Sequence, residues 1–433
     1  MKWLIMRGRE VYVAKVARLP FVSVNVGVLP TCKKEIAKRV MEIDIPRLEA
    51  ESGLKIKAEH PLNQSSYSGV SAEKLALTAL EELFLGLAID PEWIDFFRFG
   101  SVISHKTDEN AIHAFAKVVA LRAGMKRANS FTLDKACSSG LMAIGLAYDA
   151  VANKGAEFAI GGGVEKMSDV PDRLVRFGLT NPFDGRLMAA LADEVALGLG
   201  ITREELRKEL DDYAYESCRR AKEWQGIHRF IAPVKTADGQ IIQFDEKIER
   251  RAVDRRVFAK AQRYPQFAER EDSPKCEVVT PLNSAQYADG GGFVLLTDKK
   301  GLKKLKVDPL ARVVAFAEAS GGTPKNFILK PEEAVGECLM MAGLEWKKLS
   351  HIEDNAAFAV GPVSFMKRRG IERGRMNRHG DAISHGHAIG GTGGALVVKA
   401  IDISLQDQDK YYAVTVCNAV DEAPAMLFEN LRA

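Results

Sequence analysis

The chain runs Ser130-Phe131-Thr132-Leu133-Asp134-Lys135-Ala136-Cys137-Ser138-Ser139-Gly140 through the turn that decides its fold. Residues 130–133 are an expected strand, and residues 138–153 carry the apolar spacing of a helix. A second strand is expected over 157–160, ending in Gly161-Gly162-Gly163. Strand, helix and strand in this order are typical of a parallel βαβ unit, so the sequence predicts an α/β protein.

The same alternation continues on both sides of this unit. Before it, strands are expected over 10–20 and 97–103. Helices are expected over 71–86, with Ser71 as the N-cap, and over 110–123. After it, strands and helices alternate again over 312–317, 331–342, 351–360, 393–405 and 411–417. Because the last third loosely repeats the order of the first third, two similar α/β halves are predicted.

Two regions interrupt the alternation. Residues 167–287 contain many prolines and charges, and we expect them to be an inserted region on the surface. Residues 26–66 are polar, contain three prolines, and look like a second excursion from the core. This second segment could build or block a contact between subunits, or bind a partner subunit.

Composition narrows the function classes. The 433 residues are 46% hydrophobic and 27% charged, which is enough for a large core of two or three structural units. Lys and Arg number 61 and Asp and Glu 58, so the net charge of +3 gives no argument for nucleic-acid binding. Neither a signal peptide nor an apolar run of membrane-spanning length is evident.

The cysteines and histidines point to an intracellular enzyme without a bound metal. Six cysteines occur without paired spacing and without a CxxC motif, so reduced thiols and a cytoplasmic location are expected. The eight histidines show no metal-ligand spacing. Gly161-Gly162-Gly163 is not a dinucleotide fingerprint, so no such cofactor is predicted.

Cys137 is the first candidate for catalysis. It lies immediately before an expected helix, where free N–H groups and the positive end of the helix dipole stabilise a thiolate. The small residues that follow let the chain turn sharply and let a substrate approach. The alternative is a buried structural cysteine at a helix start, which is common.

His387 is the candidate base, in a glycine-rich segment that opens an expected helix. An imidazole suits general base catalysis near neutral pH, and the glycines, among them Gly386, allow close backbone approach to a ligand. A flexible glycine loop with an incidental histidine is the alternative. His379 and His385 lie nearby, so chemistry alone leaves the choice among the three open.

Cys417 and Asn355 complete the candidate set. Cys417 ends an expected strand, and beside Cys137 it would supply a second thiol. Making or breaking a carbon–carbon bond next to a thioester needs an acyl-carrying nucleophile and a separate base for the α-carbon. Asn355 follows another expected strand, where it can fix a water or donate to an oxyanion. Alone, Cys417 would be a core cysteine and Asn355 a turn residue.

At these positions the chain resembles the thiolase family, collinearly from about residue 10 to the end. Five motifs carry the resemblance. Residues 135–141 resemble the nucleophile motif, 161–168 the "GGxExMS" strand end and 283–291 the "NxSxxxDGA" stretch. Residues 355–358 resemble "NEAF", and 377–393 resemble "NxxGGAIxxGHPxGxSG". The last of these motifs selects His387 over His379 and His385.

The resemblance implies a fold of two similar βαβαβ halves in a layered α/β/α/β/α core, with an inserted loop domain for coenzyme A. The N-terminal half would comprise residues 1–166 and 288–305, the loop domain 167–287, and the C-terminal half 306–433. Family members are commonly dimers or tetramers, so a homodimer or homotetramer is implied, with acyl-CoA and CoA as substrates and no tightly bound cofactor.

The resemblance also implies the activity of an acyl-CoA C-acyltransferase of fatty acid metabolism. Cys137 would carry the acyl group, His387 would activate it and form an oxyanion hole with a water held by Asn355, and Cys417 would be the acid or base at the α-carbon. Backbone groups at Cys137, Gly386 and Ala419 would bind oxyanions. The residues implied along the bound acyl-CoA are Met188, Ala285, Ala357 and Phe358.

The chain departs from the family pattern at several positions. The family's Glu after the Asn is Ala356, the Pro after the His is Ala388, and the serine expected near coenzyme A is Ala285. The glycine-rich "CxGGG" motif becomes Cys417-Asn418-Ala419-Val420-Asp421. None of these changes removes a catalytic side chain.

Two rival functions follow. A decarboxylating ketoacyl synthase shares the implied fold, but such sites normally use one cysteine with two histidines, or His and Asn, so Cys417 argues against it. The other rival is a non-catalytic subunit that binds acyl-CoA or supports an active partner. It is motivated by Ala356 and by the altered glycine motif.

Overall fold

One mixed sheet organises the protein. The computed structural model describes residues 8–24, 65–108, 113–169, 180, 181, 183, 185–246, 248, 254–261 and 276–433. Within these ranges ten strands form a sheet of order β10-β11-β12-β9-β1-β8-β5-β3-β4, with β2 paired to β8 off this path. Their bounds are β1 (Val11–Arg18), β2 (Val22–Ser23), β3 (Phe96–Gly100), β4 (Asn129–Leu133), β5 (Phe158–Lys166), β8 (Ala288–Thr297), β9 (Ala311–Ser320), β10 (His351–Asp354), β11 (Tyr411–Thr415) and β12 (Glu422–Glu429).

The sheet consists of two topologically similar halves, as predicted. In the N-terminal half, β3 and β5 are parallel, while β5–β8 and β8–β1 are antiparallel. In the C-terminal half, β10 and β11 are parallel, while β11–β12 and β12–β9 are antiparallel. The antiparallel pair β1–β9 joins the two halves into one sheet.

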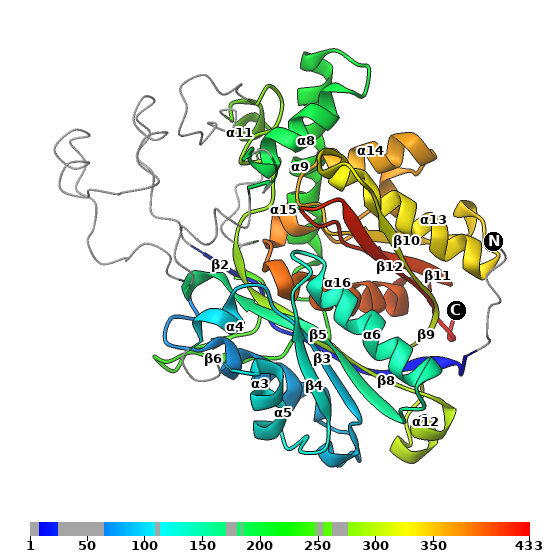
Figure 1. The fold of residues 1–433 in the computed structure, drawn as a ribbon. Helices are drawn as coiled ribbons and strands as arrows, with labels where there is room; N and C mark the ends of the chain where they lie inside the picture. Colours follow the sequence, from blue (N-terminus) through cyan, green and yellow to red (C-terminus); the bar gives the residue numbers. More distant parts are fainter. Residues whose placement is uncertain are drawn as a thin grey trace.

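Helices separate the halves and cover their outer faces, which gives the predicted α/β/α/β/α layering (Figure 1). The middle layer is α6 (Ser139–Asn153) and α16 (Ile389–Asp407), which share one apolar cluster with inward residues of both halves, such as Ala159 and Met426. Helices α3 (Ala72–Phe84) and α5 (Phe115–Arg122) pack on the other side of the N-terminal half with Phe158 and Ile160. Helices α13 (Lys330–Ala342) and α14 (Val360–Arg369) contribute to the outer cluster of the C-terminal half.

The local predictions hold apart from small shifts, such as the strand expected over 97–103, which ends at Gly100 as β3, and three further corrections. Ser71 caps α3, since its side chain accepts a hydrogen bond from the Lys74 N–H. The strand expected to end at residue 160 instead continues as β5 through the three glycines to Lys166. A Cβ at Gly163 would collide with the backbone of Gly100 and Gly390, so the glycines serve close packing rather than a turn.

The second correction concerns helix starts. The helix expected from residue 393 begins at Ile389, and the one expected from residue 110 begins at Phe115 within the described chain. Both predictions misplaced the start by a few residues, the usual uncertainty for an element boundary. The 26–66 segment lies outside the described residues except for Ser65 and Ser66.

The third correction concerns the 167–287 region, which is not only a surface insertion. It contains α8 (Met188–Leu197), the 22-residue α9 (Arg203–Trp224), the short helix α11 (Arg255–Ala259) and a ribbon of β6 (Val234–Lys235) and β7 (Ile241–Ile242). Leu206, Leu210 and Ala214 of α9 are fully buried in a cluster that also contains Val360 of α14 and Cys417. The region therefore builds part of the core next to a candidate catalytic residue.

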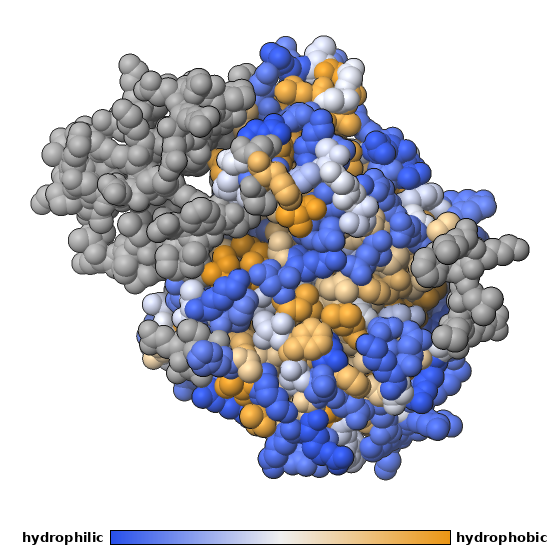
Figure 2. Space-filling model, viewed as in Figure 1, coloured by the Kyte–Doolittle hydropathy of each residue, from blue (hydrophilic) through white to orange (hydrophobic). Residues whose placement is uncertain are grey.

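In the described part of the chain, no helix is both long and apolar enough to cross a membrane. The face shown in Figure 2 is mainly hydrophilic, with apolar side chains gathered near its centre.

Glycines allow the two central helices to meet, which predicts a large packing effect. A Cβ at Gly140 of α6 would lie 2.7 Å from the Gly390 carbonyl oxygen and 3.0 Å from the Gly394 nitrogen of α16. Because both obstacles are backbone atoms, we expect Gly140→Ala to destabilise the protein by about 1–3 kcal/mol in urea unfolding. This loss exceeds the gain of about 1 kcal/mol that alanine can bring to a helix.

The matched control is Gly336→Ala in α13. There the new Cβ would first meet Trp346 at 3.4 Å, an ordinary contact. This variant should be neutral or up to about 1 kcal/mol more stable. Equal stability of the two variants would contradict the packing argument.

Candidate active site

Cys137 lies in a strained turn between β4 and α6. The preceding residue, Ala136, has a φ of 48°, a left-handed conformation that is uncommon outside glycine. Ser139 holds the turn, since its hydroxyl accepts from the Lys135 N–H at 2.8 Å and donates to the Ala136 carbonyl at 2.6 Å. The half-buried thiol packs against Ile103, Met167 and Ile389. Such local strain is typical of functional sites.

Burial controls the protonation of Cys137. Loss of solvent raises the pKa of the thiol to about 12, and the charges of Glu165 and Asp134 add to this effect, while a backbone hydrogen bond opposes it. The expected stabilisation of a thiolate by the helix start is therefore outweighed in the free protein. A nucleophilic role for Cys137 requires a base.

A buried carboxylate that the sequence reasoning left without a role connects several parts of this site. Glu165, at the end of β5, accepts hydrogen bonds from the Ser101 hydroxyl and from four backbone N–H groups, with distances of 2.6 to 3.2 Å. These N–H groups belong to residues 102–104 and to Gly390 at the start of α16. Glu165 thus fixes the loop after β3 against the helix that follows His387. The signal in the sequence was an acidic residue that directly follows the apolar run over 158–164.

His387 is held between a hydroxyl and an amide. Its Nδ1 lies 2.8 Å from the Thr392 hydroxyl, and its Nε2 lies 3.5 Å from the Asn355 side-chain nitrogen. With the Asn355 amide donating, Nε2 is the acceptor and Nδ1–H donates to Thr392. This tautomer leaves Nε2 as the basic nitrogen. The sequence reasoning did not single out Thr392, which lies inside the helix that His387 precedes.

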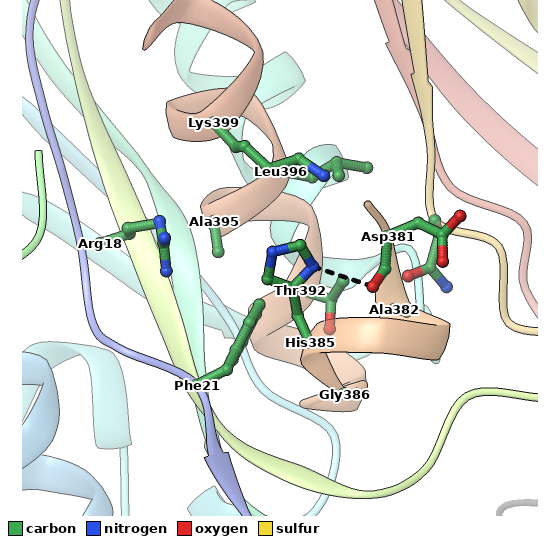
Figure 3. A pocket seen from close by; sticks show the side chains of 11 residues that line it. Arg18, Phe21, Asp381, Ala382, His385, Gly386, Thr392, Ala395, Leu396 and Lys399 are labelled. Atoms are coloured by element: carbon green, nitrogen blue, oxygen red, sulfur yellow. Dashed lines mark hydrogen bonds between the residues drawn. The ribbon is translucent and has the colours of Figure 1, made fainter. Parts of the chain in front are cut away.

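The other two histidines near His387 have different surroundings. His385 lines a small cavity of about 20 Å³ together with Phe21 and Lys399, and its Nδ1 lies 2.9 Å from the Asp381 carbonyl oxygen (Figure 3). Burial lowers the pKa of His385 to about 3. His379 is stacked on Trp224, and burial lowers its pKa to about 2. Neither histidine is suited to take up a proton at neutral pH.

Cys417 lies just beyond β11 in an apolar cluster. Burial raises the pKa of this thiol well above its usual value, and the charges of Asp354 and Cys137 contribute. Asn418 connects the two cysteines, because its side-chain amide donates to the Lys135 carbonyl and the Ser138 hydroxyl on either side of Cys137, both at 3.4 Å.

The residues expected along acyl-CoA lie near Cys417. Met188, Ala357, Phe358 and Ala419 belong to the same apolar cluster as Cys417. Ala285 joins this group through the backbone, since its N–H donates to the Ala357 carbonyl at 2.8 Å. The structure therefore brings these side chains together from α8, the 283–287 segment and the turn after Asn355.

Gly386 differs from its expected use. Its φ of 105° requires glycine, but its N–H donates to the Ala382 carbonyl at 2.9 Å. An oxyanion could bind this N–H only by displacing that hydrogen bond, so Gly386 shapes the turn rather than offering a free donor.

The candidate groups lie at the starts of helices and the ends of strands. Helices α6 and α16 abut through glycines, and each is preceded by one candidate group, Cys137 before α6 and His387 before α16. The strand ends of β10 and β11 add Asn355 and Cys417. Two thiols, an imidazole and an amide thus meet where two helix starts and two strand ends converge. This set can carry a group on sulfur and move protons beside it.

Comparisons with known proteins show the family to which the chain belongs. Residues 57–300 match the family model described as thiolase, N-terminal domain, and residues 307–430 match thiolase, C-terminal domain. The mitochondrial acetyl-CoA acetyltransferase of Rattus norvegicus is 30% identical over 84% of this chain and 87% of its own length. A cytosolic acetyl-CoA acetyltransferase of Gibberella zeae is 28% identical over 85% of this chain and 94% of its own length.

A solved structure supports the fold. The crystal structure of human mitochondrial 3-ketoacyl-CoA thiolase superposes with a TM-score of 0.79 and 23% sequence identity, covering 98% of this chain and 99% of that one. The same human enzyme has also been solved in complex with CoA.

Proposed function

The chain belongs to the thiolase family, a family of acyltransferases, and we propose that it catalyses reversible acyl transfer between a 3-ketoacyl-CoA and CoA through an acyl group on Cys137. In one direction this is thiolytic cleavage, and in the other it is Claisen condensation. The observation that supports the proposal is that Cys137 and His387 precede two helices that abut, while Asn355 and Cys417 follow two paired strands.

The first half of the reaction uses Cys137 and His387. His387 Nε2 takes the proton of the Cys137 thiol as the sulfur attacks the thioester or keto carbonyl of the substrate. Because burial makes this thiol a weak acid, the transfer occurs within the complex rather than beforehand. The oxyanion on the attacked carbonyl is stabilised by His387 and by a water held by Asn355.

The second half uses Cys417. Its sulfur exchanges a proton with the α-carbon of the acyl-CoA that leaves in cleavage or attacks in condensation. The N–H groups of Cys137 and Ala419 bind the oxygen on which negative charge develops. Ala419 lies in the same cluster as Cys417, and it can supply this N–H although the resembling motif has glycine.

The 167–287 region serves as the coenzyme A domain in this proposal, inserted between an N-terminal half of 1–166 plus 288–305 and a C-terminal half of 306–433. Met188, Ala285, Ala357 and Phe358 line the acyl-CoA. CoA is a substrate and not a resident cofactor. We further propose a cytoplasmic homodimer or homotetramer. The Gibberella zeae relative is named as cytosolic, whereas the Rattus norvegicus relative is named as mitochondrial.

Intact mass after incubation with a panel of acyl-CoAs and 3-ketoacyl-CoAs tests the proposal. A mass gain of one acyl group ranks the substrates by chain length. No adduct with any member of the panel would favour the non-catalytic subunit, or an enzyme that needs a partner chain.

Thr392 is expected to support His387 in this reaction. Thr392→Val removes the oxygen that lies 2.8 Å from Nδ1 and with it this buried hydrogen bond. Loss of a hydrogen bond to a group that becomes charged in the reaction costs about 1.5–3 kcal/mol, so the rate of Cys137 acylation should fall about 10- to 100-fold. Thr392→Ser keeps the hydroxyl and should remain close to the original rate in rapid-mixing mass measurements. Equal rates for the Val and Ser variants would contradict the role of this hydrogen bond.

A further inference from the structure

Asp354 is a buried acidic residue beside Cys417 that the proposed function leaves unused. It is the last residue of β10 and is 2% exposed. Parallel β10 and β11 pair with Asp354 opposite Thr415, and Cys417 follows Thr415 by two residues. Because the carboxyl ends of neighbouring parallel strands meet at one edge of a sheet, Asp354 and Cys417 leave the sheet close together. Burial is the main cause that raises the pKa of the Cys417 thiol, and the charge of Asp354 adds to it.

The two carboxyl oxygens of Asp354 have different surroundings. Oδ1 accepts a hydrogen bond from the Ala356 N–H at 3.2 Å. Oδ2 is buried and has no hydrogen-bond partner among the described residues. A buried carboxylate oxygen without a donor is costly, and such groups in native structures call for an explanation.

The groups around Asp354 do not neutralise it. Glu353 and Asp381 are acidic, and both disfavour its charge. The nearby cation Lys399 forms its ion pair with Glu353, at 2.7 Å. Burial is the larger effect, and together these influences raise the pKa of Asp354 to about 7. Its charge therefore appears as the pH rises through neutrality.

We propose that Asp354 is a positioning residue whose carboxylate adds to burial in holding Cys417 in its protonated thiol form, so that this cysteine enters the reaction as a proton donor. A carboxylate next to a thiol disfavours the thiolate, because two negative charges repel in a buried site. The proposal rests on the proposed function and assigns Cys417 its starting state.

The proton balance of the cleavage direction follows. When the bond between the α-carbon and the keto carbon breaks, its electron pair stays on the α-carbon and takes the proton of the Cys417 thiol. The resulting Cys417 thiolate takes the S–H proton of the incoming CoA. The CoA thiolate then attacks the acyl group on Cys137, and His387 returns a proton to the Cys137 sulfur. One S–H proton of CoA thus ends on carbon, and every side chain returns to its initial state.

The substitution Asp354→Asn distinguishes an effect of the charge from an effect of the side chain's shape. Asp354→Asn keeps an oxygen that can accept from the Ala356 N–H, so the local turn is retained. It removes only the charge. The matched control is Asp298→Asn, which also replaces a little-exposed aspartate that accepts a backbone N–H two residues ahead, in this case from Lys300 at 2.9 Å. Asp298 caps α12 (Lys299–Leu305), outside the proposed site.

The test measures the alkylation rate of Cys417 by iodoacetamide, followed by peptide mass spectrometry, between pH 5.5 and 8.5. The Cys137→Ser background leaves one active-site thiol. With Asp354→Asn we expect Cys417 to react about 10-fold faster at pH 8, where the original protein carries the Asp354 charge, and at an equal rate at pH 5.5, where it does not. Asp354→Glu should stay slow, and Asp298→Asn should change nothing.

Two results would overturn the proposal. Equal rates at all pH values would mean that the charge does not act on Cys417. Faster alkylation by the same factor at every pH would mean that the substitution opens the site, a structural effect. The measurement does not require catalysis. Absence of an acyl adduct in the protein with Cys137 intact would count against the proposed function alone.

Discussion

Replacing Cys137 by serine is expected to abolish the acyl adduct and to lower turnover by a factor on the order of 10³ or more, as removal of an enzyme nucleophile typically does. The serine hydroxyl is a far weaker acid and a weaker nucleophile than the thiol. His387 would therefore have to remove a much less acidic proton before the oxygen could attack. Intact mass after incubation with acyl-CoA measures the first effect, and a thiolysis assay measures the second.

The control for this substitution is Cys338→Ser. Cys338 is a fully buried residue of α13 whose Sγ donates to the Ala425 carbonyl at 3.3 Å, and a serine hydroxyl can make the same bond. This variant should keep the adduct. An acyl adduct that persists in Cys137→Ser would place the nucleophile elsewhere and would refute the assignment.

Replacing Cys417 by alanine is expected to separate the two halves of the reaction. Cys137 should still be acylated, because His387 and Asn355 are untouched. Exchange of the α-protons of acetyl-CoA with D₂O, and condensation, should fall by about 10²–10⁴-fold, the usual contribution of a positioned acid or base. Mass spectrometry follows the adduct on the protein and the deuterium in acetyl-CoA.

Cys218→Ala is the matched control. Cys218 is buried in the same apolar cluster, and this substitution also removes one sulfur atom. It should retain both halves of the reaction. Full condensation activity in Cys417→Ala would show that the scheme with two thiols is wrong.

Much of the fold could be predicted because its signals are local. The turn between β4 and α6, the Ser71 cap and the repeated order of strands and helices all depend on residues close in sequence. The resemblance to thiolases rests on motifs of this kind, and the family match confirms it.

The predictions were wrong where a run of glycines or a polar composition is compatible with two different structures. Gly161–Gly163 looked like the end of a strand, but they continue β5 because α6 and α16 pack closely on it. The 167–287 region looked peripheral because it is rich in proline and charge, yet α9 buries Leu206 and Leu210 beside the site. No local pattern identifies the partner against which such residues pack.

The sequence by itself determined which chemical groups were available, namely two thiols, an imidazole and an amide at the ends of strands and helices. The tertiary structure alone decided their protonation and their partners. Burial raises the pKa of Cys137 against the favourable effect of the helix start, Thr392 orients His387, and the paired ends of β10 and β11 bring Asp354 to the edge of the sheet that Cys417 follows. Desolvation and charge interactions depend on what surrounds a group in space, and part of that environment comes from residues far away in the sequence, such as Ile389 beside Cys137.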